Sequence, residues 1–198
     1  MITDINALDP HARYTFADYL QWAFAERVEL IRGRLMRMSP APNTWHQRLV
    51  GRFYIAFHES LGNGPCEVFL APFDVRLPAP GHQRSGMHAD TVVQPDLCVV
   101  CDPTLLDERG CCGAPDLIVE ILSPGNSRKE LSAKFDLYES SGVREYWIAD
   151  PDHQHILAYT LSNEGSYSGS RPYTTSDTLQ SVVLPGFSLE VSKLFQGK

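Results

Sequence analysis

The sequence lacks any apolar run long enough to cross a membrane, for which about 20 consecutive apolar residues are needed. Its opening residues, MITDINALDPHARY, contain two aspartates and no apolar core segment, which argues against a secretory signal peptide. Internal repeats and low-complexity stretches are absent as well. These absences predict a soluble, cytoplasmic protein that has no membrane partner.

Positive charge is scarce. The 17 Lys and Arg residues face 24 Asp and Glu residues, which gives a formal net charge of −7. Strong non-specific DNA binders carry a basic field, so this balance argues against such a protein. It is compatible with a nuclease in which part of the acid excess serves a metal ion. A cluster of Arg32, Arg34 and Arg37 either contacts phosphate or forms an ordinary solvated edge.

The five cysteines do not form the framework of a secreted disulfide-rich domain. Cys98 and Cys101 have the spacing of a CxxC motif. They fall in an expected strand, however, where their side chains point to opposite faces. We therefore expect buried, reduced thiols at these two positions. We do not expect a zinc site at Cys111 and Cys112.

The length of 198 residues suits one domain with a sizeable core. We expect an N-terminal arm at residues 1–13 and a single domain at 14–198. Helical and strand patterns interleave along the chain, which predicts an α/β fold with an antiparallel C-terminal extension. The expected helices are 15–25, 43–61 and 128–141, and the expected strands are 28–31, 35–38, 66–70, 74–77, 97–101, 116–122, 143–149, 156–161, 170–175 and 178–183.

The apolar strand near residues 117–122 is the most informative segment, because an acid interrupts it. Alternate side chains point to opposite faces, and both faces are apolar apart from Glu120, which predicts an interior strand. A buried carboxylate without a partner is unfavourable, so Glu120 needs a cation or hydrogen-bond donors. Glu120 is therefore a metal-binding or catalytic residue, a member of a structural salt bridge, or a strand-end acid that reaches water.

The next helix is expected to carry a lysine on its buried side. A capping box at Ser127 predicts a helix that begins near Arg128. At about 100° per residue, Lys134 falls on the buried stripe of this helix. Its ammonium either approaches Glu120 or reaches solvent by snorkelling. The stripe consists of Leu131, Phe135 and Tyr138.

Two Pro-Asp pairs offer a second acid. Asp116 shares a strand with Glu120, but four residues span about 13 Å, too far for one ion to bind both carboxylates. Asp96 begins a different strand and is free to approach. We therefore assign Asp96 to the site and expect Asp116 to be a strand-start or loop residue.

These residues resemble the PD-(D/E)XK, restriction-endonuclease-like superfamily, in its Uma-two branch of endonucleases. The resemblance runs from about Tyr14 to Pro151 and rests on an ordered set of motifs, since Pro-Asp alone is weak evidence. The motifs are Glu29–Gly33, Met38–Pro40 with His46, Gln94–Leu97, Val119–Pro124, Lys134 with Tyr138, Gly142–Trp147 and Asp150 with Pro151.

The resemblance implies a restriction-endonuclease-like mixed central sheet flanked by helices. In the superfamily pattern a lysine lies two residues after the second acid, but that position holds Leu122 here. The resemblance implies that Lys134 replaces the missing lysine from the helix, and helix geometry selects the same residue. If Lys134 does not reach the acids, catalysis is in doubt while the fold is not.

The implied chemistry is metal-assisted hydrolysis of a phosphodiester bond. Asp96 and Glu120 would hold Mg²⁺ or Mn²⁺, which polarises the phosphate and lowers the pKa of a bound water. Lys134 would orient that water or offset charge on the phosphate. Glu29, from the Glu-Leu-Ile pattern of the family, is either a further catalytic acid or a solvated hairpin residue.

Two accessory residues complete the expected site. Gln94 is a candidate for positioning Asp96 or a water molecule. His46 falls in the first turn after a cap at Asn43, and it is either functional or a surface histidine.

We therefore expect a metal-dependent endonuclease whose partner is nucleic acid, with DNA favoured over RNA. Exposed sheet edges and the two-fold symmetry of duplex DNA favour a homodimer. One alternative is a binding or regulatory module with a nuclease fold, which Leu122 and the negative charge favour. The other is a metal-dependent phosphoesterase that acts on small substrates.

Overall fold

The structure is a computed structural model that describes residues 1–38, 43–79, 81–82, 84–123 and 128–197. Expectations for Ser39, Pro40, Pro124 and the Ser127 cap fall outside this part of the chain. The helices are α1 (Phe16–Tyr19), α2 (Thr44–Leu61), α3 (Arg128–Ser141) and α4 (Val191–Phe195). The strands are β1 (Val28–Ile31), β2 (Arg34–Arg37), β3 (Glu67–Leu70), β4 (Val75–Arg76), β5 (Val92–Val93), β6 (Leu97–Val100), β7 (Leu106–Asp107), β8 (Gly110–Cys111), β9 (Leu117–Ile121), β10 (Glu145–Asp150), β11 (His155–Leu161), β12 (Tyr167–Gly169), β13 (Tyr173–Thr174), β14 (Thr178–Gln180) and β15 (Ser188–Glu190).

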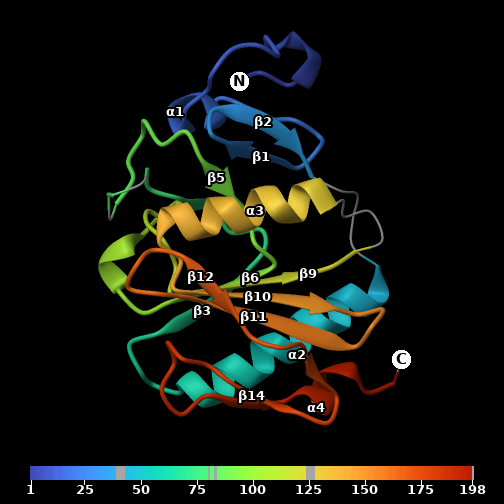
Figure 1. The fold of residues 1–198 in the computed structure, drawn as a ribbon. Coiled ribbons are helices and arrows are strands. Elements are labelled where there is room, and N and C mark those ends of the chain that lie inside the picture. The colour runs from blue at the N-terminus through green and yellow to red at the C-terminus, as the bar shows by residue number, and fades with distance from the viewer. Residues whose placement is uncertain (39–42, 80, 83, 124–127, 198) are drawn as a thin grey trace.

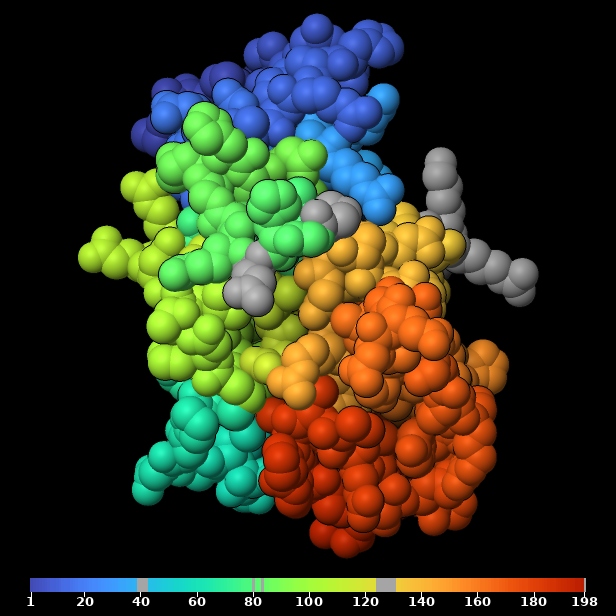
Figure 2. Space-filling model, turned by 60° about the vertical axis from the view of Figure 1, so that its left-hand side comes forward, coloured from blue at the N-terminus to red at the C-terminus, as the bar shows by residue number. Residues whose placement is uncertain are grey.

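The elements form layers around a seven-stranded sheet of order β12-β11-β10-β9-β6-β3, with β13 paired to β11. Helix α3 covers one face of this sheet and α2 covers the other (Figure 1). Strands β1, β2 and β5 belong to a second sheet, which lies on the same side of the central sheet as α3 (Figure 1). The N-terminal residues lie at one end of the molecule and the C-terminal residues at the opposite end (Figure 2). The predicted α/β class with a mixed central sheet flanked by helices is confirmed.

Helix α2 forms as its sequence predicts. The Asn43 side chain accepts a hydrogen bond from the backbone N–H of His46 at 2.8 Å, which caps the first turn. Gly62 ends the helix with a φ of 52°, a conformation that favours glycine. The buried residues of this helix include Leu49, Phe53 and Phe57, which repeat every four residues.

Helix α1 is shorter than the predicted span of 15–25. The capping box of Thr15 and Asp18 is present, but the helix ends at Tyr19. The N-terminal segment competes for the backbone that follows, because the N–H of Ile2 donates to Gln21 and its carbonyl accepts from Ala23. These contacts form a short bridge between the two segments in place of further helical turns.

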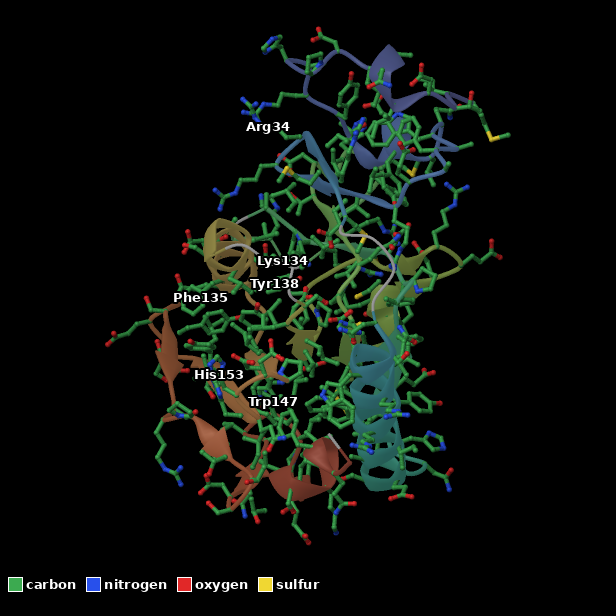
Figure 3. The ribbon with its side chains drawn as sticks, turned by 90° about the vertical axis from the view of Figure 1, so that its right-hand side faces the viewer. Arg34, Lys134, Phe135, Tyr138, Trp147 and His153 are labelled. Carbon is green, nitrogen blue, oxygen red and sulfur yellow. A yellow bond between two sulfur atoms is a disulfide. The ribbon has the colours of Figure 1, made fainter. Side chains whose placement is uncertain are left out.

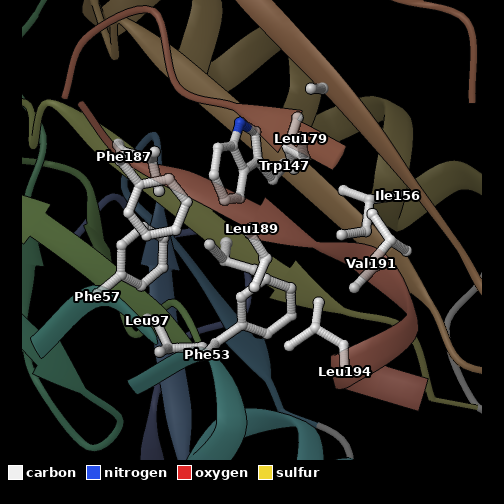
Figure 4. Close-up of a cluster of buried hydrophobic side chains, with 14 of the residues drawn as sticks. Phe53, Phe57, Leu97, Trp147, Ile156, Leu179, Phe187, Leu189, Val191 and Leu194 are labelled. Atoms are coloured by element: carbon white, nitrogen blue, oxygen red, sulfur yellow. The ribbon is translucent and has the colours of Figure 1, made fainter. Parts of the chain in front are cut away.

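The central sheet places its apolar faces as predicted. Strand β9 pairs parallel with β10 and antiparallel with β6. Leu117, Val119 and Ile121 join the core on the α2 side, whereas Ile118 joins the core on the α3 side. On the α2 side, Phe53 and Phe57 pack against Trp147 and Phe187 (Figure 4).

The prediction of reduced thiols is correct for Cys98 and wrong for Cys101. Cys98 is buried and free, but Cys101 forms a disulfide with Cys66, with the two Cα atoms 3.8 Å apart. The β3–β6 register pairs Glu67 with Val100, so the two cysteines lie opposite each other one position further along. The spacing within one strand could not reveal this pairing, because it depends on the register between two strands.

The C-terminal extension is antiparallel, as predicted, but its strands differ in extent. Strand β11 pairs with β12 and β13, and β14 pairs with β15, a strand that the sequence pattern missed. Helix α4 packs beside α2 at this end of the molecule (Figure 1). None of the helices in the described ranges is both long and apolar enough to cross a membrane.

Candidate functional site

Two acids meet where strands β6 and β9 run side by side. The register pairs Leu97 with Val119, so Asp96, just before β6, lies opposite Glu120 at the next position. Directly opposed residues of antiparallel strands point to the same face, with Cβ atoms about 4.5–5.5 Å apart. The Asp96 Oδ2 also accepts a hydrogen bond from the N–H of Ile121 at 2.8 Å, which fixes its carboxylate beside β9.

Helix α3 brings Lys134 to these acids. The Lys134 Nζ donates to Glu120 Oε1 at 2.8 Å and lies 3.3 Å from Glu29 Oε1. The hydroxyl of Tyr138, one helical turn later, donates to the same Glu120 oxygen at 2.7 Å. Lys134 and Tyr138 both extend from the side of α3 that faces the sheet (Figure 3). Position 122, where the superfamily pattern has its lysine, holds leucine, and an amine from the helix contacts Glu120.

Glu29 is buried on β1 and is not a solvated hairpin residue. Its side chain is only 7% exposed. The Oε1 atom accepts the backbone N–H of Gln94 at 2.9 Å as well as the contact from Lys134. The second sheet thus contributes a third carboxylate to the site, opposite the two from the central sheet.

His46 is also buried and is not a surface histidine. The Asn43 cap sets the first turn of α2 so that the His46 Nε2 lies 3.1 Å from Asp96 Oδ2. Burial alone would lower the pKa of His46, but its hydrogen bond and charge interaction with Asp96 raise the pKa above its ordinary value. The pair therefore favours an imidazolium beside a carboxylate.

Burial and neighbouring charges shift the pKa values of both Glu120 and Lys134. The pKa of Glu120 is raised to about 7: burial raises it most, the Lys134 ammonium lowers it, and the Asp96 and Glu29 carboxylates raise it. For Lys134, burial alone would lower the pKa, but the attraction of Glu120 and Glu29 outweighs it and the net pKa is raised. Lys134 therefore stays an ammonium at neutral pH and cannot act as a base there.

Tyr138 holds its proton firmly. Burial, followed by the nearby Glu120 charge, raises the pKa of its phenol well above the ordinary value. The hydroxyl therefore remains a hydrogen-bond donor to Glu120 throughout the physiological pH range. Tyr138 was predicted as part of the buried stripe and was named with Lys134 in the family pattern, but it was not assigned to the site. Its position four residues after Lys134 placed both groups on one face.

The predicted residues share one pocket of about 140 Å³. Its wall combines charged groups with apolar side chains such as Ile31, Met36 and Leu131. Arg27 and Arg37 line the same pocket and bring positive charge to it. Arg27 was not among the predicted residues, although it lies two residues before Glu29 and so points to the same face of the chain. The predicted residues lining the pocket are Glu29, His46, Gln94, Asp96, Glu120 and Lys134.

Gln94 lies in the pocket but positions a different acid from the one expected. Its backbone N–H binds Glu29, and its side-chain oxygen accepts from Arg27 at 2.8 Å. Its side-chain nitrogen donates to Asp74 at 2.8 Å. These contacts tie Gln94 to β1 and to the segment before β4, whereas the expected partner was Asp96 or a water molecule.

Asp116 is separate from the pocket, as predicted. Its carboxylate accepts the backbone N–H of Cys101 at 2.7 Å and a hydrogen bond from Arg144 at 2.8 Å. These contacts hold the start of β9 between the end of β6 and the start of β10. Asp116 therefore has a structural role, and the choice of Asp96 over Asp116 agrees with the geometry.

The donor set fits a hard divalent cation. Three carboxylates lie around one ammonium and one histidine, and Arg27 and Arg37 line the same pocket. Oxygen ligands of this kind suit Mg²⁺ or Mn²⁺. Both hydrogen bonds to Glu120 use Oε1, so they do not engage Oε2. Asp96 and Glu120, which lie opposite each other, are the residues that could hold such an ion. The ligand oxygens of Asp96, Glu120 and Glu29 do not all lie within 4.8 Å of one another, so Glu29 is a neighbour of this pair.

Comparison with known proteins adds three findings. A family model described as "Uma2: Putative restriction endonuclease" matches residues 16–192. An uncharacterised protein of Synechocystis sp. is 24% identical over 191 residues, which cover 95% of this chain and 94% of that protein. A solved structure, of "a putative nuclease belonging to DUF820" from Anabaena variabilis, aligns with a TM-score of 0.70 at 19% identity, over 92% of this chain and 97% of the other. At that identity the structural likeness concerns the fold.

Proposed function

This chain belongs to the Uma2 family, described as "Putative restriction endonuclease", and from that premise we propose that it is a metal-dependent endonuclease that cleaves DNA. One observation carries the proposal. Three carboxylates and an ammonium, contributed by β1, β9, α3 and the residue before β6, converge on one pocket. Such a set is costly for folding, because it desolvates several charges at once. A catalytic use of those charges accounts for that cost.

Each side chain has a role in the proposed reaction. Asp96 and Glu120 would hold a Mg²⁺ or Mn²⁺ ion, with Glu29 as a further acid at the same pocket. When bound, such an ion polarises a phosphate and acidifies a water molecule. The Lys134 ammonium offsets negative charge that develops on the phosphate, a task for which its raised pKa suits it.

The remaining pocket residues position these groups. His46 holds the Asp96 carboxylate, and Tyr138 holds Glu120 at the oxygen shared with Lys134. Arg27 and Arg37 would bind the flanking phosphates of a nucleic-acid strand, which a chain of net charge −7 otherwise repels. We infer that binding to DNA is local, through this pocket, and not through a broad basic surface.

A cleavage assay on plasmid and linear DNA, with Mg²⁺ or Mn²⁺, tests the proposal. Wild type should cleave, and Lys134→Met should lose turnover while it stays folded. Lys193→Met is the matched control, because Lys193 is an exposed lysine on α4 paired with Glu190, and it should retain activity. Metal binding without turnover on any substrate would favour the binding module. Turnover on small phosphodiesters but not on DNA would favour the phosphoesterase.

We further propose that the protein acts as a homodimer. Strand β2 is an edge of its sheet, and a two-fold axis would match the symmetry of duplex DNA. Light scattering at micromolar concentration should then give about twice the chain mass of 22.2 kDa. A mass near that of one chain would reject this part of the proposal.

A further inference from the structure

A second group of metal-ligating side chains lies at the turn between β10 and β11. One ligand atom from each of Asp150, His153 and His155 lies within 4.8 Å of the others. None of the three is among the residues that line the pocket of Glu120. Figure 3 likewise shows His153 apart from Lys134 and Tyr138. The proposed nuclease chemistry uses none of these residues.

The backbone fixes two of the three side chains. Asp150 and His155 are the final cross-strand pair of β10 and β11, so they point to the same face of the sheet. The Asp150 Oδ1 accepts the backbone N–H groups of Asp152 at 2.8 Å and His153 at 3.1 Å. Its other oxygen, Oδ2, lies 2.8 Å from His153 Nδ1. The turn therefore holds the carboxylate by one oxygen and presents the other to imidazole.

The group is open to solvent. The His153 side chain is 76% exposed, and that of Asp150 is 16% exposed. An ion bound here would have three protein ligands and room for water at its remaining positions, as in metal sites that are not closed by protein. Metal–ligand bonds of about 2.0–2.1 Å require the ligand atoms to move closer together. The exposed ring of His153 is free to make that adjustment.

We propose that this turn binds a borderline divalent transition-metal ion, such as Zn²⁺, through Asp150, His153 and His155. Two imidazoles with one carboxylate suit Zn²⁺, Co²⁺ or Ni²⁺, whereas Mg²⁺ prefers oxygen ligands throughout. The ion would join the end of β10 to the start of β11 and so clamp the turn. The two sites would then differ in metal as well as in place, with a hard cation in the pocket and a softer one at the turn.

The test is a calorimetric titration of the full chain with Zn²⁺ in the presence of saturating Mg²⁺, which occupies the pocket. Wild type should bind one equivalent of Zn²⁺, and His153→Ala or His155→Ala should weaken that binding by about tenfold or more. His88→Ala, which removes an exposed histidine elsewhere, is the control and should bind as wild type does. Added Zn²⁺ should raise the Tm of wild type and of the control only.

Two results would overturn the proposal. One is equal Zn²⁺ affinity in wild type and His153→Ala. The other is Zn²⁺ binding that disappears in Asp96→Ala but persists in His153→Ala, since the ion would then occupy the pocket. DNA cleavage with Mg²⁺ is measured separately in His153→Ala, where it should persist. The two proposals can therefore fail independently.

Discussion

Two carboxylates on neighbouring strands of one sheet, one fully and one largely buried, have opposite surroundings. Glu145, on β10, is 1% exposed and accepts hydrogen bonds from Trp147, Ser181 and the backbone of Val182 and Val183. All of these donors are neutral, and Glu145 does not line the pocket of Glu120. Glu120, on β9, has an ammonium and two further acids as neighbours and faces that pocket.

The contrast shows that burial of an acid does not by itself indicate a functional site. Glu145 stabilises the packing of the C-terminal strands, because neutral donors satisfy its oxygens and exclude water. Glu120 lies beside the carboxylates of Asp96 and Glu29, and these negative charges repel one another unless a cation offsets them. The two acids therefore differ in the charge of the groups around them.

The largest expected difference is in catalysis. Glu120→Gln should lower DNA cleavage by about 10²-fold or more, because it removes a proposed metal ligand. Glu145→Gln, the matched change at the other buried acid, should leave the rate per folded molecule unchanged. Initial cleavage rates at saturating Mg²⁺, corrected for the folded fraction, provide the measurement. An equal loss of cleavage rate in both variants would contradict the view that Glu120 is catalytic and Glu145 is structural.

The free energy of unfolding should show the reverse order, with the larger loss at Glu145 and the smaller at Glu120. Glu145→Ala leaves the indole N–H, the Ser181 hydroxyl and two backbone N–H groups without their acceptor, so it should cost about 3–5 kcal/mol of unfolding free energy. Glu120→Gln should cost far less in metal-free protein, because it removes one of several competing negative charges. Urea unfolding in EDTA measures both values. A larger loss for Glu120→Gln than for Glu145→Ala would contradict the account.

Stability should also depend on pH through Glu120. Its pKa of about 7 in the folded protein exceeds the ordinary value of 4.5, so the native state keeps a proton that the unfolded chain releases. This contribution to stability is fully present below pH 4.5 and is lost as pH rises through about 7. Glu120→Gln should lack this decline, as followed by urea midpoints in EDTA. A difference between the two proteins that stays constant from pH 4 to pH 8 would count against the raised pKa.

The smallest expected effect is at Tyr138. Tyr138→Phe removes one neutral donor to Glu120 but leaves Lys134 in contact with it. We expect a loss of about 1 kcal/mol in transition-state stabilisation, which is roughly fivefold in kcat. Steady-state kinetics on an oligonucleotide substrate can resolve that change. A loss as large as that of Lys134→Met would mean that Tyr138 takes part in the chemistry itself.

Periodicity and caps in the sequence predicted the elements that position the site. The alternation around Glu120 gave the two faces of β9, and the helical stripe placed Lys134 on the buried side of α3. Both are local patterns, so they need no knowledge of how distant segments pack. The same reasoning selected Asp96 over Asp116, because strand geometry limits how far one ion can reach.

Contacts between distant segments could not be predicted in this way. The burial of Glu29 and His46 depends on how β1 and α2 pack against the central sheet, and local pattern favoured neither a buried nor an exposed position. The Cys66–Cys101 disulfide depends on the β3–β6 register. The four hydrogen-bond donors to Glu145 lie up to 38 residues away along the chain, so local sequence patterns could not predict them either.

Calorimetric titration with Mn²⁺ tests the central claim most directly. The His153→Ala background serves as the starting protein, so that the turn between β10 and β11 does not contribute. This protein should bind Mn²⁺ in the pocket, and adding Asp96→Ala or Glu120→Ala should abolish that binding while the fold persists. Adding Lys134→Met or Glu145→Gln should preserve it. Unchanged Mn²⁺ affinity after both Asp96→Ala and Glu120→Ala would contradict the assignment of these acids to a metal site.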